Sequence, residues 1–374
     1  MPHLKKLSLL NFKNYAEAEL ELSPEVNCFA GFNGSGKTNL LDAIYYMSFC
    51  KSYFNPIDSQ NIRHDEAFFV IQGTFEKKDK EERVYCGLKK GQKKQFKRNK
   101  KEYERLADHI GLFPAVIISP SDVDLIKEGS EFRRKFMDGI ISQYDRAYLS
   151  WLIDYNKALS QRNHLLKTFA EQRYFDADSL DIWDAQLIDL SRKIHKERSR
   201  FMEEFMPEFN ALYKAISGGN EEVMITYKSQ LNEGVFEEKF KSHLDRDRSF
   251  QRTTAGIHKD DLLFEIGGHP MKKFGSQGQQ KSFLISLKLG QFRFIRQISG
   301  LTPILLLDDI FDKIDDQRVS YLMQLVTNHE FGQIFITDTD PDRVPSIFDS
   351  TDVDLKVFEV EEGSVAPVKQ EVEK

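Results

Sequence analysis

The stretch GFNGSGKTNLLDAIYYM, residues 31–47, decides the fold of this chain. Its first eight residues fit the pattern GxxxxGK followed by Ser or Thr, with the apolar run VNCFA before it and an amphipathic helical pattern after it. Glycines let successive backbone N–H groups turn inward around phosphate oxygens, and the beginning of a helix adds a partial positive charge. The stretch therefore predicts an α/β fold with a nucleotide-binding loop. The alternative is a glycine-rich turn that binds nothing.

The residues of this loop have separate predicted roles. Lys37 would reach the β- and γ-phosphate oxygens, and Thr38 would offer its hydroxyl to Mg²⁺. The motif alone does not separate a kinase from a GTPase or a transporter motor. The residues of the loop predicted to bind ATP are Gly31, Asn33, Gly34, Ser35, Gly36, Lys37, Thr38 and Asn39.

The run ILLLDD, residues 304–309, is a second part of the predicted site. A short apolar run that ends in two carboxylates is typical of a buried parallel strand with its acids at the carboxyl end, beside the phosphate loop. Asp308 would position Mg²⁺ together with Thr38, and Asp309 would orient or deprotonate the attacking water. With Lys37, these two acids are the predicted catalytic residues. The alternative is an acidic turn that closes a core strand.

The segment SQGQ, residues 276–279, begins an apolar helical pattern and predicts another anion site at a helix N-terminus. One nucleotide carries only one triphosphate. Two phosphate-facing helix ends in one chain therefore favour the interpretation that this one, with Ser276, Gly278 and Gln279, caps the nucleotide of another subunit.

The segment KKGQKKQFKRNKK, residues 89–101, is strongly basic although the chain has a net charge of −6. The strand-like run VYCGLKK overlaps its start, and Gly91 allows a turn, so the pattern predicts a basic hairpin that could lie along DNA. The alternative is a solvated charged face. The predicted DNA-binding residues are Lys89, Lys90, Lys93, Lys94, Lys97, Arg98, Lys100 and Lys101.

The remaining patterns indicate two lobes. Strand-like runs such as HLKKLSLLNF and FFVIQGTF predict antiparallel β structure in the first part of the chain. Residues 121–249 predict a helical lobe, with Pro207 kinking or ending its last long helix. The polar tail after Glu359 is expected to be frayed. The apolar stripe expected on the last long helix comprises Ile182, Leu187, Leu190, Ile194, Phe201, Phe205, Phe209 and Leu212.

Length and composition limit the class of protein. The chain has 374 residues, of which 40% are hydrophobic, so it can bury a large core. Its apolar runs are much shorter than the roughly 20 residues of a membrane span, and its N-terminus has no signal-peptide pattern. We therefore expect a cytoplasmic protein with no membrane partner.

The phosphate loop, the acidic strand and SQGQ together resemble the head domain of ABC-type ATPases. The chain more closely resembles the RecF family of bacterial recombination-mediator ATPases. Several of the pieces that carry this resemblance are not general ATPase motifs. In chain order the pieces are NFKNY, GFNGSGKTNLLDAIY, SPSDVDLIKEGSEFRRKFMD, YNKALSQRNHLLK, WDAQL, GIHKDDL, SQGQQKS and LLLDDIFDKID.

The resemblance implies an ABC-type head whose ATPase lobe, with an antiparallel β subdomain, comprises residues 1–120 and 250–374, with an inserted helical lobe of residues 121–249. It also implies an ATP-dependent, head-to-head dimer. Such a dimer would clamp DNA at gaps or single-strand/duplex junctions and, with RecR and RecO, promote RecA loading in recombinational repair and replication restart. It also implies a weak, DNA-stimulated ATPase that acts mainly as a switch. A generic ABC-type ATPase subunit with a non-DNA partner is the alternative.

The chain departs from the ABC pattern at several positions. Asp309 is one methylene shorter than the Glu that many ABC ATPases carry, so we expect slow hydrolysis. Thr337 stands where a switch histidine is expected, and the Gln-loop position falls near Ser119. The stretch FDKID, with Asp312 and Lys313, stands where the RecF family tends to have Ser and Glu, so the dimer contacts of this stretch stay open. The roles of His258, Arg133 and Arg134, structural or functional, also stay open.

Overall fold

Two structural units divide the chain, and the boundary differs from the one expected. The computed structural model describes residues 1–219, 221–310, 330–349 and 351–368, so Asp312 and Lys313 lie outside the described residues. The first unit comprises Met1–Asp122 with Leu287–Lys374, and the second is Val123–Ser286. Residues 250–286 therefore belong to the inserted unit, because strand β10 within them pairs with β9 of the insertion.

A six-stranded sheet in the first unit positions the phosphate loop. Its order is β15-β14-β3-β13-β12-β8, and the five strands from β14 to β8 are parallel. The strands before the loop and before Asp308 are wholly buried, as predicted for apolar runs covered on both faces. The bounds are β3 (Val26–Ala30), β8 (Ala115–Ile118), β12 (Ile304–Leu307), β13 (Ile334–Asp338), β14 (Leu355–Glu361) and β15 (Ser364–Pro367).

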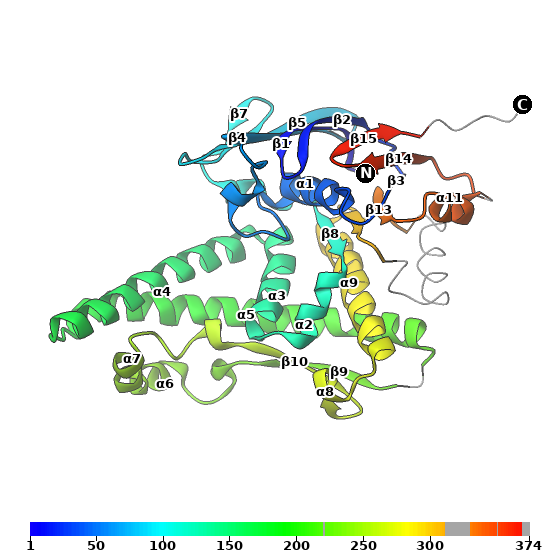
Figure 1. Cartoon of the computed structure of the whole chain (residues 1–374). Helices are drawn as coiled ribbons and strands as arrows, with labels where there is room; N and C mark the ends of the chain where they lie inside the picture. Colours follow the sequence, from blue (N-terminus) through cyan, green and yellow to red (C-terminus); the bar gives the residue numbers. More distant parts are fainter. Residues whose placement is uncertain (220, 311–329, 350, 369–374) are drawn as a thin grey trace, which may run out of the picture. The chain divides into compact units, whose positions relative to one another are not determined.

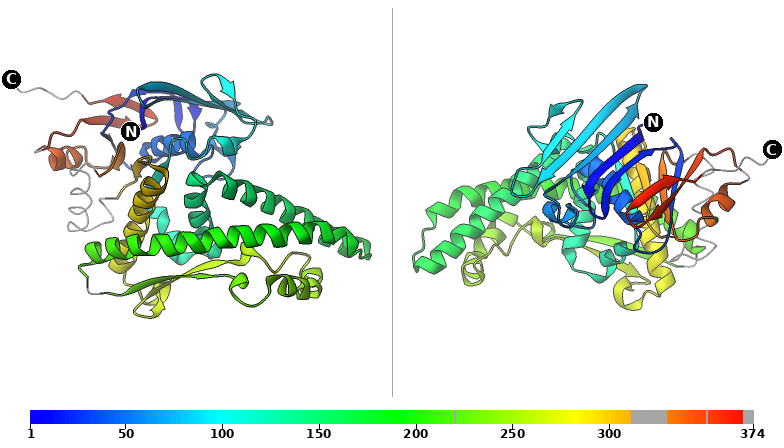
Figure 2. Two further views of the ribbon diagram at one scale, coloured as in Figure 1. Left: turned by 180° about the vertical axis from the view of Figure 1, so that it is seen from behind. Right: turned by 45° about the horizontal axis from the view of Figure 1, so that its top comes forward.

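The predicted antiparallel β subdomain is the second sheet of this unit, with the order β2-β1-β4-β5-β6-β7. Its strands run side by side in blue and cyan in Figure 2. Strands β5 and β6 pair on either side of Gly91, which confirms the predicted basic hairpin. The bounds are β1 (His3–Phe12), β2 (Tyr15–Glu21), β4 (Phe68–Lys77), β5 (Lys80–Lys89), β6 (Gln95–Arg98) and β7 (Lys101–Glu102).

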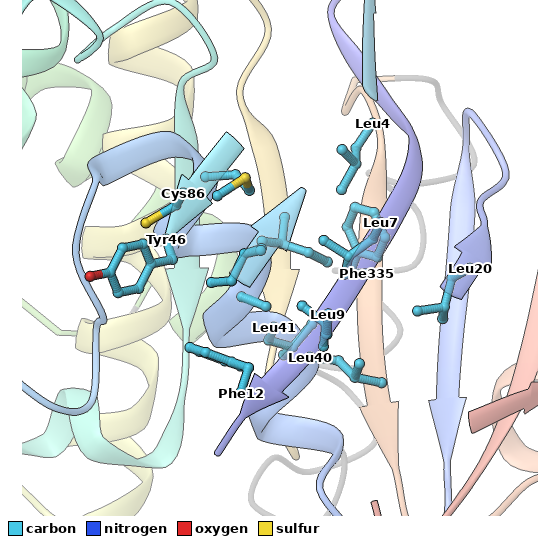
Figure 3. Close-up of a cluster of buried hydrophobic side chains, with 14 of the residues drawn as sticks. Leu4, Leu7, Leu9, Phe12, Leu20, Leu40, Leu41, Tyr46, Cys86 and Phe335 are labelled. Carbon is cyan, nitrogen blue, oxygen red and sulfur yellow. The ribbon is translucent and has the colours of Figure 1, made fainter. Parts of the chain in front are cut away.

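Helix α1 (Lys37–Phe49) contacts strands of both sheets and lies at the centre of the core. Leu40 and Leu41 of α1 lie near the inward-facing leucines of β1, and Phe335 of β13 belongs to the same cluster (Figure 3). Each such fully buried side chain contributes about 1.5–3 kcal/mol. Because α1 is packed on two faces, its first turn is held in one position.

The C-terminal segment after Glu359 is ordered through Pro367, in contrast to the expected frayed tail. Strands β14 and β15 form an antiparallel hairpin, and Val360 is fully buried. The Gly363 N–H in the turn of this hairpin donates to the Ser35 carbonyl at 3.1 Å. The tail is therefore a support of the phosphate loop.

The second unit is built on the helices α3 (Ser130–Tyr144), α4 (Arg146–Gln172) and α5 (Asp178–Ser217). Helices α4 and α5 lie side by side over most of the length of α4 (Figure 1). A three-stranded sheet of β9 (Val223–Lys228), β10 (Asp261–Ile266) and β11 (His269–Pro270) belongs to the same unit. The remaining helices are α2 (Asp124–Lys127), α6 (Phe236–Ser242), α7 (Leu244–Phe250) and α8 (Met271–Phe274), with α9 (Gln277–Ser299) crossing the unit boundary and α11 (Arg343–Phe348) in the first unit.

Helix α5 corrects two expectations. It continues through Pro207 to Ser217 instead of ending there. Phe205 and Phe209, on either side of the proline, are buried, and their packing offsets the lost backbone hydrogen bond. Ile182 is 68% exposed and does not belong to the apolar stripe, whose other predicted members are buried.

Two buried arginines connect the helices of the second unit. Arg162 of α4 contacts Asp184 of α5 at 2.5 Å and Asp247 of α7 at 2.6 Å. Arg198 of α5 binds Asp138 and, at 2.7 Å, Asp260. The motifs YNKALSQRN and WDAQL therefore meet through Arg162 and Asp184, and GIHKDDL is held by the second arginine through Asp260.

Lys94 is a correction to the predicted DNA-binding set. Its ammonium donates to Asp58 Oδ2 at 2.7 Å, to the Cys50 carbonyl at 2.6 Å and to Tyr46 Oη at 3.0 Å. Its side chain is 10% exposed. The side chain turns inward because Tyr46 and Cys50 at the end of α1, together with Asp58 of the following loop, offer it three oxygen acceptors, and it is not available to a phosphate.

Replacing Lys94 with Met should destabilise the protein by about 2 kcal/mol, because the half-buried Asp58 carboxylate loses its cation. Lys93→Met is the matched control, because Lys93 is exposed, and it should stay within about 0.5 kcal/mol. Urea unfolding of both variants measures the difference. Equal unfolding midpoints would show that the inward contacts of Lys94 contribute nothing.

Candidate functional site

The turn between β1 and β2 holds the phosphate loop through side-chain hydrogen bonds. Asn14 Nδ2 donates to the Ser35 carbonyl at 2.9 Å, and Tyr15 Oη donates to the Gly36 carbonyl at 3.1 Å. Asn14 Oδ1 accepts from Asn39 Nδ2 at 2.8 Å. These contacts hold the last residues of the loop and the first turn of α1 together.

The loop has the geometry of a phosphate cradle. Gly34 and Gly36 have φ values of 84° and 120°, which favour glycine. Ser35 is buried, and its hydroxyl has no hydrogen-bond partner among the described residues. Lys37 donates its ammonium protons to the carbonyls of Gly31 at 2.7 Å and Phe32 at 3.1 Å, across the loop. An unsatisfied hydroxyl and an ammonium beside inward-turning glycines fit a bound phosphate.

Thr38 and Asp308 come together, as the sequence predicted, from positions far apart in the chain. The Thr38 hydroxyl donates to Asp308 Oδ1 at 2.8 Å. Burial raises the pKa of Asp308 to about 6, although the hydrogen bond from Thr38 acts in the opposite direction. A hydroxyl and a buried carboxylate are hard oxygen ligands suited to Mg²⁺, whose charge would compensate the cost of burying the carboxylate.

Thr337 links the two acids at the end of β12. Its hydroxyl lies 3.1 Å from Asp308 Oδ1 and 3.3 Å from Asp309 Oδ1, and it accepts the Asp309 N–H at 2.8 Å. Asp309 has a φ of 44°, an uncommon conformation for a non-glycine residue. The threonine at the switch position therefore orients Asp309 and supplies no titratable group.

Ser276 and Gln279 form a capping box at the beginning of α9. The Gln279 N–H donates to Ser276 Oγ at 3.2 Å, and the Ser276 N–H donates to Gln279 Oε1 at 2.6 Å. Gln279 Nε2 also donates to Glu221 Oε1 at 2.7 Å. Ser276 is exposed at this helix N-terminus, where an anion would be favoured. Contact of the Gln279 amide with a phosphate would require exchange of these bonds.

The basic hairpin retains an exposed positive surface without Lys94. Arg98 is paired with Glu82 at 2.5 Å, which offsets its charge. Lys97 lies over the ring of Tyr85, 5.5 Å from its centroid, on the outward face of the sheet. The predicted residues that make no ion pair among the described residues are Lys89, Lys90, Lys93, Lys97, Lys100 and Lys101.

The structural interpretation of His258 is favoured by its contacts. His258 Nδ1 accepts from Tyr155 Oη at 2.6 Å, and Nε2 donates to the Thr253 carbonyl at 3.0 Å. Burial lowers the pKa of His258 to about 4, so the ring is neutral at pH 7. Both ring nitrogens are used within the second unit.

Arg133 and Arg134 are also engaged within the second unit. Arg133 forms a bidentate pair with Asp261 at 2.7 and 3.1 Å. Arg134 donates to the Asp260 carbonyl at 2.7 Å and to Ser130 Oγ at 2.6 Å. These contacts account for both residues as structural groups.

Sequence reasoning missed three supports of the site in the first unit. It gave no role to Asn14 or to the buried Asp42 of α1, which accepts from Lys13 and Ser52. It also missed the buried pair of Asp122 and Lys288 at 2.7 Å, close to the expected Gln-loop position. The signal for Asn14 was its place in the quoted NFKNY motif. The partner of Asp122 is distant in the sequence, and the contacts of Asp42 with Lys13 and Ser52 follow no recognised spacing. Neither acid therefore left a pattern in the sequence.

This geometry defines a P-loop ATPase with an ABC-type head and an inserted helical unit. The family model described as the RecF/RecN/SMC N terminal domain matches residues 3–364. The Smc head domain of Pyrococcus furiosus, bound to the C-terminal domain of ScpA, has the same fold with a TM-score of 0.58 at 18% identity. The alignment covers 98% of this chain and 96% of that one.

The chain belongs to the RecF family. It is 53% identical to the DNA replication and repair protein RecF of Flavobacterium johnsoniae, over 95% of this chain and 99% of that protein. It is 52% identical to the RecF of Phocaeicola vulgatus, over 99% and 100%. The solved structure of the recombination mediator protein RecF with ATP, in the RecFOR pathway, superposes with a TM-score of 0.89 at 30% identity and 98% coverage of both chains.

A membrane-spanning helix needs roughly 20 predominantly apolar residues. Within the described part of the chain, no helix is both long enough and apolar enough to cross a bilayer.

Replacing Gly36 with Ala should abolish ATP binding, because a Cβ there would overlap the Asn14 amide and lie 2.9 Å from Tyr15 Oη. Gly34→Ala is the matched control. It also has a positive φ but no atom within 4 Å, and should cost about 1 kcal/mol of backbone strain without a clash. Titration with a fluorescent ATP analogue compares the two. Equal affinities would contradict the support of the loop by Asn14 and Tyr15.

Proposed function

We propose that this chain acts in DNA replication and repair as an ATP-dependent DNA clamp of the RecF type. The observation that carries the proposal is the meeting of Thr38, Asp308 and Thr337 beside the phosphate loop, in a chain related to RecF proteins over nearly its full length. That arrangement supplies a phosphate cradle and two hard oxygen ligands at the carboxyl end of a parallel sheet.

ATP with Mg²⁺ is the proposed cofactor. Bound Mg²⁺ would neutralise charge on the phosphate oxygens. The loop N–H groups and Ser35 would hold the phosphates, while Lys37 would leave the Gly31 and Phe32 carbonyls for the β and γ oxygens. Thr38 and Asp308 would hold the ion. Asp309, fixed by Thr337, would orient the attacking water and accept its proton. Its short side chain supports a slow reaction, in which the nucleotide acts mainly as a switch.

Dimerisation follows from the position of the capping box. Ser276, Gly278 and Gln279 are proposed to contact the γ-phosphate held by a second copy, because the exposed N-terminus of α9 favours an anion. Two chains would then enclose two ATP molecules. Closure needs ATP in both sites, and hydrolysis releases the clamp.

DNA is the proposed partner of the closed dimer, at gaps or single-strand/duplex junctions. The exposed lysines of the basic hairpin support phosphate contacts. A related recombination mediator belongs to the RecFOR pathway. We therefore propose that RecR and RecO are partners of this chain and that the DNA-bound dimer promotes loading of RecA.

The first test is equilibrium binding of a labelled gapped duplex, with and without ATP, by wild type and Ser276→Arg. Wild type should bind at least about 10-fold more tightly with ATP, and Ser276→Arg should lose this gain while still binding ATP. Ser276→Thr, which keeps a hydroxyl at the helix cap, is the control for cap loss. ATP-independent binding by the wild type would contradict the clamp and leave an ATPase with another partner.

The second test concerns hydrolysis. Asp309→Asn keeps the backbone bond to Thr337 but cannot accept a proton, so the rate should fall about 100-fold and the ATP-bound dimer should accumulate. Asp349→Asn, at an exposed carboxylate, should leave both unchanged. Phosphate release and size-exclusion chromatography give the two readouts. An unaltered rate in Asp309→Asn would remove Asp309 from catalysis.

A further inference from the structure

A second basic surface lies on the inserted unit, far in sequence from the hairpin. Phe250, the last residue of α7, is 55% exposed. The guanidinium of Arg246 lies 5.7 Å from the centroid of its ring, and that of Arg252 lies 5.8 Å from it. We call Arg246, Phe250, Arg252 and Lys259 the α7 surface. The α7 surface therefore places a flat apolar ring and positive charges side by side in contact with solvent.

The three cations of the α7 surface are not neutralised by carboxylates among the described residues. Among the described residues, Arg246, Arg252 and Lys259 form no ion pair with a carboxylate. Other exposed cations of the same unit do, such as Lys193 with Asp189 at 2.7 Å. Burial lowers the pKa of Lys259, the positive charges of Arg252, Arg134 and Arg246 act in the same direction, and the Asp247 carboxylate opposes them.

The backbone beneath the α7 surface is held in place by buried contacts. Asp247 of α7 binds Arg162 at 2.6 Å and accepts from the Thr254 N–H and hydroxyl at 2.8 and 2.6 Å. Asn163 Oδ1 accepts the Thr253 N–H at 2.7 Å, and His258 binds the Thr253 carbonyl. Arg162, Asn163 and His258, which have no role in ATP chemistry, thus fix the backbone that carries these cations. The segment cannot relax to separate the charges.

Another face of α7 borders an aromatic pocket of about 490 Å³. Arg248 and Ser249 line it together with Phe169, Tyr174 and Phe175. The Arg248 guanidinium lies 4.1 Å from the Phe175 ring centroid, and its ion-pair partner Asp245 is 3.8 Å away and almost fully exposed. Flat, apolar surfaces beside guanidinium groups therefore occur on two faces of the same helix.

We propose that the α7 surface binds single-stranded DNA. Arg246, Arg252 and Lys259 would contact phosphates, and Phe250 would stack on an unpaired base. An intact duplex offers phosphates but no free base face, so Phe250 would add nothing to duplex binding. An acidic protein segment would satisfy the cations but would not use the exposed ring. The inference rests on the proposed function only for the choice of DNA over RNA.

The experiment measures anisotropy of a labelled 30-nucleotide oligothymidylate, and of a 30-base-pair duplex, with the full chain in the absence of nucleotide. The variants are Phe250→Leu and the triple change Arg246→Gln, Arg252→Gln, Lys259→Gln. The matched control neutralises three exposed cations of the same unit that have carboxylate partners, Arg192, Lys193 and Lys241. Thermal unfolding checks that every variant is folded.

The triple variant should bind oligothymidylate more weakly, and the slope of log affinity against log salt should fall by about 2, at about 0.7 per lost phosphate contact. Phe250→Leu should lose about 10-fold in affinity with an unchanged slope. The control triple should match wild type, and Phe250→Leu should leave duplex affinity unchanged. Oligothymidylate binding by the triple variant with wild-type affinity and slope would overturn the proposal.

Two further outcomes separate this inference from others. If the triple variant loses binding to poly-L-glutamate but keeps oligothymidylate binding, the surface recognises an acidic protein segment and the proposal is wrong. If wild type shows the expected single-strand binding but no ATP-dependent binding of a gapped duplex, the clamp function fails while the α7 site stands.

Discussion

Burial of α1 on two faces is the constraint on which the nucleotide-binding unit depends. The helix packs between an antiparallel sheet and a mostly parallel sheet, so its N-terminal turn cannot shift without disturbing the core. The β1–β2 turn then holds the loop through Asn14 and Tyr15, and the C-terminal hairpin holds it through Gly363. A phosphate site built from backbone N–H groups works only when the backbone is rigid.

Buried charge has a different role in the inserted unit. Arg162 and Arg198 each bind two carboxylates from other elements and are almost wholly inaccessible to solvent. Such networks add little net stability compared with apolar packing, but removing one member leaves an uncompensated charge. They therefore select one arrangement of α3, α4, α5 and α7. In the first unit, the pair of Asp122 and Lys288 has the same character.

Much of the candidate site was predictable because its signals are local. The loop, the strand before it and the acidic end of β12 are short motifs with defined neighbours, and the structure places Thr38 against Asp308. Predictions failed where a local pattern met a distant partner. Lys94 lies in a uniformly basic run but turns inward to acceptors near the end of α1. The tail after Glu359 is polar in sequence yet is ordered by the β14–β15 hairpin, which extends a strand that pairs with β3 up to Glu359.

The sequence by itself determined the class of fold, the phosphate loop with the pairing of Thr38 and Asp308, and the family, because these depend on residue type and spacing over short stretches. Only the tertiary structure decided which cations face solvent, that Thr337 orients Asp309, that His258 is a structural group and that the inserted unit extends to Ser286. These features depend on contacts between residues tens or hundreds of positions apart. Burial and hydrogen-bond geometry at such contacts follow from packing and leave no period in the sequence.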